Sequence, residues 1–415
     1  MVSCFTILNG FSQTNNNSSF NYQYLNIEST FLKANVDIVI SLPVNYKKEK
    51  IKYPVVYVLD GKWFFSQAVT TQLHAKRYKQ TPDFIVVGIE NTTRQRSWFM
   101  KGASKFNQFL EKELITTIHK KIRANNERLL FGWEASGGFV FDALGANSNL
   151  FSGYLAASPI PIDNSFMTRY QYRLDAIKEV LKKKSSKRPF LYFATGKSDF
   201  PSQYGVDNML TLLNKEDTSA LDWEYTYLKD EKHPTAGYKT LNDGILKYFS
   251  YFPVLRFSTT KEFVENGNMK AVKTYYKERL MKYQFSEAKN TKDYLNTCRG
   301  IVFIAMNEKN YKVFDNHVQS FLPQNMLGVT HYNHAAMFAD FYLKNNNTIM
   351  AAKLMNYYTN KFPKAARPFA VLGKVFQQEG NREKARAFYL KAIDLGTKSS
   401  DRRLQEYKNS LANLK

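Results

Sequence analysis

Residues 126–159 read NERLLFGWEASGGFVFDALGANSNLFSGYLAASP and contain the pattern that decides the fold. The run Leu129–Gly132 predicts a buried strand, Ser136–Leu144 an apolar helix, and Gly153–Ala157 a second buried strand. A strand that enters a helix through a tight turn of small residues is typical of a nucleophile elbow at the carboxyl edge of a parallel sheet. The tip of this turn carries Glu134 and no serine.

The chain upstream of this stretch alternates between strand-like and helix-like segments. Strands are predicted over Val36–Leu42, Tyr53–Leu59 and Asp83–Ile89, and helices over Trp63–Lys79 and Gly102–Ile118. Strands that alternate with helices favour a doubly wound α/β sheet. We therefore expect the elbow to lie at the edge of such a sheet.

The segment RLLFGWEASGGF, followed by LFSGYLAASP, resembles the putative esterase family of α/β hydrolases, the esterase D-like and enterochelin-esterase-like group. Members typically read R-x-x-x-G-H-S-x-G-G-x-F and then L-F-x-G-Y-x-A-x-S-P. In a gapless alignment the family's histidine falls on Trp133, its nucleophilic serine on Glu134, and its two glycines on Ser136 and Gly137. The resemblance runs over about residues 22–255 and implies an α/β-hydrolase domain there.

The other candidate catalytic residues lie after two later strands. Strand-like runs end before Asp199 and before His233, which gives the chain order nucleophile, acid, histidine that hydrolases of this fold share. Asp207 and Asp230 remain alternative partners for His233. The resemblance supports His233 because a Gly and a closing Phe follow it, as in the family.

Three interpretations of the elbow follow from these residues. In the first, Glu134 replaces the nucleophile and the domain is a degenerate hydrolase with a binding or scaffold role. In the second, Ser136 is the nucleophile of an active carboxylic-ester hydrolase, with His233 and Asp199. In the third, the Glu134 carboxylate itself attacks and His233 activates the water that resolves the intermediate.

An active site of this kind needs donors for the oxyanion. We expect the backbone amides of Ala135, Gly61 and Lys62 in that role, a small ester or acyl compound as ligand, and neither cofactor nor metal. Arg94 and Arg96 could bind an acidic substrate, although a solvated loop is the commoner location for such residues.

After Pro253 the sequence predicts helices alone. Residues 332–365 and 366–399 fit tetratricopeptide repeats, and a weaker repeat at about 293–325 and a helix at Lys261–Tyr283 precede them. We expect an all-α domain over residues 256–415. Such a stack either binds a peptide or protein partner, or is a packing module that buttresses the hydrolase domain or mediates self-association.

Composition limits the remaining possibilities. The formal charge of +23 comes from scattered Lys and Arg without a nucleic-acid motif, so we expect no nucleic-acid partner. Two isolated cysteines, Cys4 and Cys298, predict no disulfide framework, and no apolar run is long enough for a transmembrane segment. Residues 1–21 resemble a degenerate signal-like tail or linker, which implies a periplasmic or secreted protein if a truncated signal peptide lies upstream and a cytoplasmic one otherwise.

Overall fold

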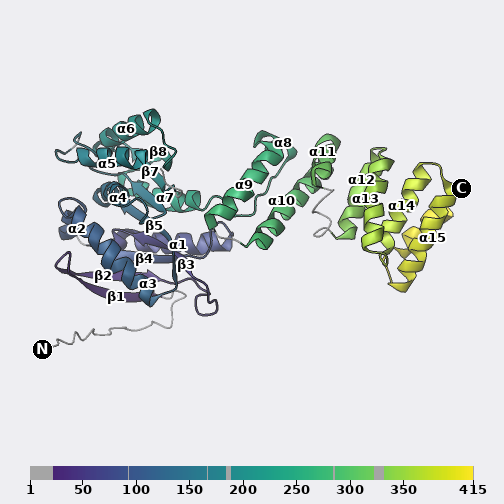
Figure 1. The fold of residues 1–415 in the computed structure, drawn as a ribbon, viewed down its shortest axis with the longest axis horizontal. Helices are drawn as coiled ribbons and strands as arrows, with labels where there is room; N and C mark the ends of the chain where they lie inside the picture. Colours follow the sequence, from purple (N-terminus) through teal and green to yellow (C-terminus); the bar gives the residue numbers. More distant parts are fainter. Residues whose placement is uncertain are drawn as a thin grey trace. The chain divides into compact units, whose positions relative to one another are not determined.

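The computed structural model describes residues 22–91, 93–165, 167–183, 188–283, 286–321 and 331–414, so the signal-like tail expected at residues 1–21 lies outside the described part. The chain divides into two compact units, Met1–Pro253 and Val254–Lys415. The first is an α/β unit, purple to teal in Figure 1, and the second is helical, green to yellow.

The α/β unit is built on an eight-stranded sheet with the order β1-β2-β4-β3-β5-β6-β7-β8. The strands β3 to β8 run parallel to one another, whereas β1 and β2 pair in antiparallel fashion at one end. The expected doubly wound α/β sheet is therefore confirmed. The strands are β1 (Tyr22–Ser29), β2 (Ala34–Ser41), β3 (Tyr53–Val58), β4 (Ile85–Glu90), β5 (Ala124–Trp133), β6 (Gly153–Ala157), β7 (Phe190–Lys197) and β8 (Asp222–Lys232).

Helices cover both faces of this sheet. On one face α1 (Gly61–Arg77) and α7 (His233–Tyr248) pack against the strands and against each other. On the other face α4 (Ala135–Ala146), α5 (Gln171–Lys182) and α6 (Phe200–Lys215) share a buried core with the strands. Neighbouring strand residues serve opposite faces, because Leu130 belongs to that second core while Phe131 contacts Phe64 of α1, with ring centroids 5.2 Å apart.

Strand β1 and the helix expected at Gly102–Ile118 differ from the sequence-based expectation. The polar and half-buried strand β1 has only a weak apolar alternation and was not predicted. The single helix expected at Gly102–Ile118 is divided into α2 (Ala103–Gln108), a π-helical turn η2 (Phe109–Leu114) and α3 (Ile115–Lys121). The π turn lets the consecutive residues Phe109 and Leu110 both face the core.

The helical unit begins with a break between two helices that the sequence pattern does not indicate. The expected helix Lys261–Tyr283 is two helices, α8 (Thr260–Glu265) and α9 (Asn268–Tyr283), because Gly267 adopts a φ of 95° between them. The following helices are α10 (Glu287–Asn307), α11 (Tyr311–Phe321), α12 (Tyr332–Lys344), α13 (Thr348–Lys361), α14 (Ala366–Gln378), α15 (Arg382–Lys398) and α16 (Leu404–Ala412).

Side chains from successive helices of this unit form a continuous apolar core. Phe314 of α11, Phe338 and Tyr342 of α12 and Tyr358 of α13 are all buried within it. An all-α part after the sheet is therefore confirmed (Figure 1). Within the described ranges, none of the helices is both long and apolar enough to span a bilayer.

Candidate functional site

The tip of the elbow is one residue long. Strand β5 ends at Trp133, helix α4 begins at Ala135, and Glu134 lies between them with φ 56° and ψ −115°. A side chain at Gly132 would place its Cβ 2.3 Å from the carbonyl oxygen of Ser136, so this close strand-to-helix approach requires glycine. The strained tip thus follows from how tightly α4 turns back on β5.

Main-chain hydrogen bonds hold Glu134 in this conformation. Its N–H donates to the carbonyl of Ala157 at 3.0 Å, and its carbonyl accepts from Gly138 at 2.8 Å and from Ile160 at 3.0 Å. A non-glycine residue with such a positive φ costs about 1–3 kcal/mol, and conformations of this kind cluster at functional sites. The side chain of Glu134 therefore projects from a rigidly held position.

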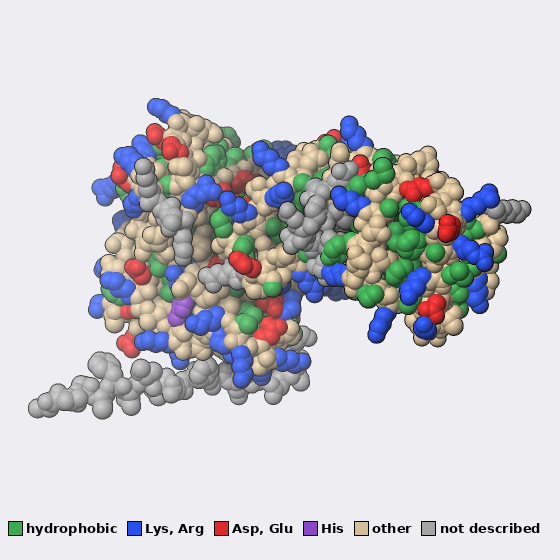
Figure 2. Space-filling model, turned by 45° about the vertical axis from the view of Figure 1, so that its right-hand side comes forward, with side chains coloured by type: hydrophobic (Ala, Val, Ile, Leu, Met, Phe, Trp, Pro, Cys, Tyr) green, Lys and Arg blue, Asp and Glu red, His purple; other side chains and the backbone are tan. Residues whose placement is uncertain are grey.

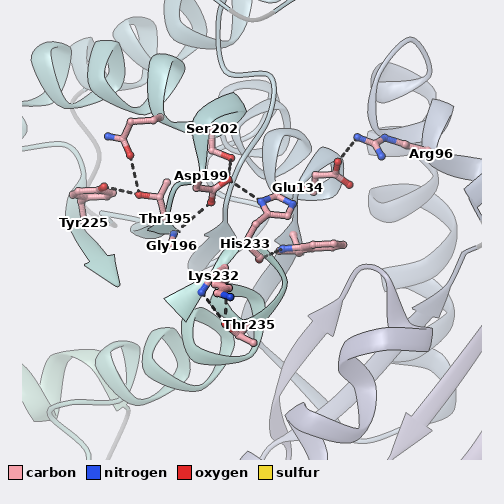
Figure 3. Close-up of polar contacts among 12 residues, drawn as sticks. Arg96, Glu134, Thr195, Gly196, Asp199, Ser202, Tyr225, Lys232, His233 and Thr235 are labelled. Atoms are coloured by element: carbon pink, nitrogen blue, oxygen red, sulfur yellow. Dashed lines mark hydrogen bonds and ion pairs between the residues drawn. The ribbon is translucent and has the colours of Figure 1, made fainter. Parts of the chain in front are cut away.

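The Glu134 carboxylate is paired with an arginine. Arg96, on the 3₁₀ helix η1 (Thr93–Phe99), places its Nη2 2.6 Å from Oε1 of Glu134 (Figure 3). The end of η1 is fixed to α4 by the fully buried Arg173, which donates to the carbonyl of Phe99 at 2.8 Å and forms an ion pair with Asp142. The segment that carries Arg96 is thereby anchored to the helix that begins at the elbow.

Beside the elbow, the histidine and its acid are in direct contact. Nδ1 of His233, the first residue of α7, lies 2.7 Å from Oδ1 of Asp199, which precedes α6 (Figure 3). The Asp199 side chain is fully buried and the His233 side chain is 31% exposed, so the imidazole is partly accessible to solvent. Asp199 also accepts from the Ser202 hydroxyl at 3.1 Å and from the Gly196 amide.

The contact between Asp199 and His233 lowers the pKa of Asp199 and raises the pKa of His233. Burial alone would raise the pKa of Asp199, but hydrogen bonds led by that from His233 outweigh it and hold the pKa below its ordinary value. The hydrogen bond to Asp199 raises the pKa of His233 against the effect of burial, and the charges of Asp199 and Glu134 add to the rise. The site therefore favours an imidazolium next to two carboxylates.

Trp133 occupies the space beside this histidine. Its indole Nε1 donates to the His233 carbonyl at 3.1 Å, and the two ring centroids are 5.0 Å apart. Phe64 of α1 lies on the indole with centroids 5.8 Å apart. Trp133 thus fixes the start of α7 from the elbow side.

The Ser136 hydroxyl is directed into a different hydrogen-bond network. Its side chain is buried, and Oγ accepts from the Trp133 N–H at 2.7 Å and forms a hydrogen bond with the Asp60 carboxylate. Asp60 also accepts from Nδ2 of Asn91 at 2.6 Å, and burial raises its pKa. Ser136 therefore joins the elbow to the turn after β3.

This link brings the N-termini of two helices together. Ala135 is the first residue of α4, and Gly61 and Lys62 are the first residues of α1, so their amides have no carbonyl partner within their own helices. Asp60 adopts the left-handed conformation with φ 55° and ψ 44°, which turns β3 into α1. Gly61 fits because a Cβ there would lie 2.9 Å from the carbonyl oxygen of Ile89.

The structure thus brings together Glu134, His233 and Asp199 and directs Ser136 elsewhere. Asp207 accepts instead from Nε2 of Gln203 at 2.7 Å, on the exposed side of α6. Arg96, expected either to bind an acidic substrate or to lie in a solvated loop, is paired with Glu134, and nothing in its sequence neighbourhood indicates a partner 38 positions later. The contact between Asp60 and Ser136 is not indicated by the sequence, although an Asp-Gly directly after a buried strand is a usable signal for a turn. Within the described ranges, no group of His, Cys, Asp and Glu residues could hold a metal ion.

Comparisons with known proteins agree with this fold. A family model described as putative esterase matches residues 29–242. The crystal structure of an IroE-like serine hydrolase from Shewanella oneidensis is similar at a TM-score of 0.52 and 23% identity, covering 72% of this chain and 99% of that one. An uncharacterised protein from Capnocytophaga ochracea has a TM-score of 0.50 at 16% identity over 94% of this chain and 99% of its own.

A third similar structure is the siderophore hydrolase EstA from Aspergillus nidulans, with a TM-score of 0.50 and 18% identity over 58% of this chain and 98% of that one. At these identities the likeness shows the fold alone. No curated protein matches the sequence.

Proposed function

Because the chain belongs to the putative esterase family, we propose that it is a non-catalytic member that binds a ligand at the family's site without cleaving it. The observation that carries this proposal is the ion pair of 2.6 Å between Arg96 and Glu134 at the tip of the elbow. A carboxylate cannot form with an ester the acyl-enzyme that a serine forms. In this chain the negative charge of Glu134 is also neutralised by the Arg96 guanidinium.

The Ser136 alternative conflicts with the position of the hydroxyl. A nucleophile must reach both a general base and the substrate carbonyl, whereas Ser136 is buried and its Oγ is bonded to Asp60 and to the Trp133 backbone. The Glu134 nucleophile alternative is disfavoured by the ion pair, because attack would require the carboxylate to leave Arg96. We therefore assign neither residue a catalytic role.

The ligand that we propose is a small ester or acyl compound. The amides of Ala135, Gly61 and Lys62 supply hydrogen-bond donors for its carbonyl oxygen at the two helix N-termini. His233, whose pKa is raised by its hydrogen bond to Asp199, offers a further hydrogen-bonding group beside them. Such a site would hold the carbonyl group without attacking it.

The helical unit supports a proposal of its own, that it is a tetratricopeptide-type array. Arg367 and Asn333 are in contact at 3.4 Å and Lys374 and Asp340 at 2.9 Å, and each pair is 34 residues apart, one period of such a repeat. The residues of 366–399 therefore follow those of 332–365 in register.

Labelling with a fluorophosphonate probe tests the main proposal. We expect no adduct on the wild-type chain by intact mass, beside a serine hydrolase that labels fully. Saturation-transfer NMR with ethyl butyrate should detect binding while the ester stays intact. An adduct on Ser136 that Ser136→Ala removes would overturn the proposal and establish an active hydrolase, and absence of any ester binding would refute the binding role.

A further inference from the structure

Arg96 keeps unused hydrogen-bonding capacity at the tip of the elbow. A guanidinium carries five N–H donors, and here Nη2 contacts Oε1 of Glu134 at 2.6 Å. Within the described residues Arg96 makes no further hydrogen bond or ion pair. Its side chain is 48% exposed, against 22% for that of Glu134, so it is accessible to a ligand. The planar fork of an arginine can hold a second carboxylate beside the first.

The main chain that carries Arg96 is held in place by aromatic packing. Phe99, the last residue of η1, packs against Phe139 of α4 with ring centroids 5.9 Å apart and against Phe106 of α2 with centroids 5.1 Å apart. Trp98 stacks on Phe106 with centroids 5.8 Å apart. Arg96 is therefore presented from a fixed segment, so a ligand that binds it does not have to order the backbone.

The charges of Arg96 and Glu134 both act on the rest of the site. In Figure 3 the Glu134 side chain lies between Arg96 and His233. The pKa of His233 is raised chiefly by its hydrogen bond to Asp199, while the charge of Glu134 raises it further and that of Arg96 lowers it. The same two charges act in opposite directions on Asp60, whose pKa is raised mainly by burial. The guanidinium thus lies within electrostatic range of both the histidine and the turn after β3.

The other carboxylates of the site are already engaged. Asp199 is fully buried, and the Asp60 oxygens accept hydrogen bonds from Asn91 and from Ser136. The charge of Glu134 is balanced by Arg96 itself. A ligand carboxylate on another edge of the guanidinium therefore meets a cation whose existing partner is already paired.

We propose that the ligand of this site is a monoester of a short dicarboxylic acid whose free carboxylate binds Arg96. This assignment rests on the proposed function, because the ester carbonyl takes the amides of Ala135, Gly61 and Lys62. An extended glutamate side chain spans about 5 Å and a hydrogen bond about 3 Å, so the guanidinium lies within about 10 Å of the Ala135 amide. Two or three methylenes between the carbonyl and the carboxylate let a ligand reach both groups.

The probes must separate Arg96 from the general charge of the chain. That charge is +23, and Figure 2 shows Lys and Arg side chains spread over the visible face with fewer acidic ones among them. Such a surface attracts any anion weakly. Monoethyl succinate carries a carboxylate where ethyl butyrate has its terminal methyl group, and β-alanine ethyl ester carries an ammonium there. Ligand-observed NMR titrations of the full-length chain, at neutral pH and physiological salt, compare the three esters.

We expect monoethyl succinate to bind about tenfold more tightly than ethyl butyrate, because it gains a charge-assisted hydrogen bond, and β-alanine ethyl ester to bind most weakly. Arg96→Gln should abolish this preference while ethyl butyrate still binds. Arg96→Lys should keep only part of it, because an ammonium does not offer a planar fork to two carboxylates. Thermal unfolding and the retained binding of ethyl butyrate show that the variants are folded.

Lys101→Gln is the matched control. It removes one positive charge from an exposed residue just after η1, and it should change the affinity for monoethyl succinate by less than about twofold. Equal binding of the three esters, or equal loss of monoethyl succinate in Arg96→Gln and Lys101→Gln, would overturn the dicarboxylate assignment and leave the proposed function standing. Hydrolysis of the esters with the preference retained would overturn the proposed function and still support the assignment. Binding of none of the esters would overturn both.

Discussion

Glu134→Ser should convert this chain into an esterase. The substitution places a hydroxyl at the tip that the main-chain bonds to Ala157, Gly138 and Ile160 already hold. Nδ1 of His233 lies 2.7 Å from Asp199, so the imidazole is already oriented by its acid. The substitution supplies the nucleophile that such a pair would serve.

The size of the effect follows from the geometry. Serine inherits the same φ of 56°, so the strain does not change, and the partly exposed ion pair to Arg96 contributes about 0–1 kcal/mol to stability. The variant should thus remain folded. A positioned general base accelerates proton transfer by about 10²–10⁴-fold, and we expect Glu134→Ser to exceed Glu134→Ser with His233→Ala by that factor.

The assay is release of 4-nitrophenol from its acetate ester, together with a fluorophosphonate adduct mapped to position 134. The rate should rise as pH rises through the folded pKa of His233, because the neutral imidazole is the base. That pKa should lie below the wild-type value, since the raising effect of the Glu134 charge is gone. A folded Glu134→Ser chain that hydrolyses no faster than Glu134→Ala would refute the inference that the remaining machinery is intact.

Three further predictions concern stability and protonation. Glu134→Gly should stabilise the fold by about 1 kcal/mol in urea unfolding, because glycine accepts a positive φ freely; a destabilised variant would contradict the strain assigned to the elbow. In Asp199→Asn the pKa of His233, followed by NMR, should fall, and an unchanged titration would refute the coupling. In the wild-type chain the pair stabilises the fold fully at pH values below the unfolded pKa of His233. That stabilisation is lost as the pH rises through the raised pKa of His233 in the folded state. Gly132→Ala should lower the free energy of unfolding by more than about 2 kcal/mol, since its Cβ would lie 2.3 Å from a backbone oxygen. Gly300→Ala, with open space around it in α10, should be neutral or stabilising. Equal effects of the two substitutions would disprove the steric argument.

The sheet could be predicted from the sequence because its central strands are continuous apolar runs. Gly153–Ala157 was predicted with the bounds that the structure shows, and the elbow followed from the small residues after β5. Strand β1 could not be predicted because an edge strand buries one face only weakly, so its apolar alternation is faint. The π turn could not be predicted because local periodicity does not reveal which consecutive residues are both buried in the core.

The site was predictable only where chain order carries information. Asp199 and His233 follow late strands, and parallel strands deliver such loops to one edge. Arg96 could not be paired with Glu134 in advance, since that contact depends on how Arg173 anchors η1 to α4. The orientation of the Ser136 hydroxyl depends likewise on Asp60, which is far away in the sequence.

The contact between Trp133 and His233 gives the protein an intrinsic optical reporter. An imidazolium at contact distance from an indole interacts with its ring and quenches its emission. The fluorescence intensity of Trp133 should therefore change with the protonation of His233. It should also change when a bound ligand displaces the His233 imidazole from the indole. Occupancy of the site can then be followed in unlabelled protein, with Trp133→Phe defining the background from the other tryptophans.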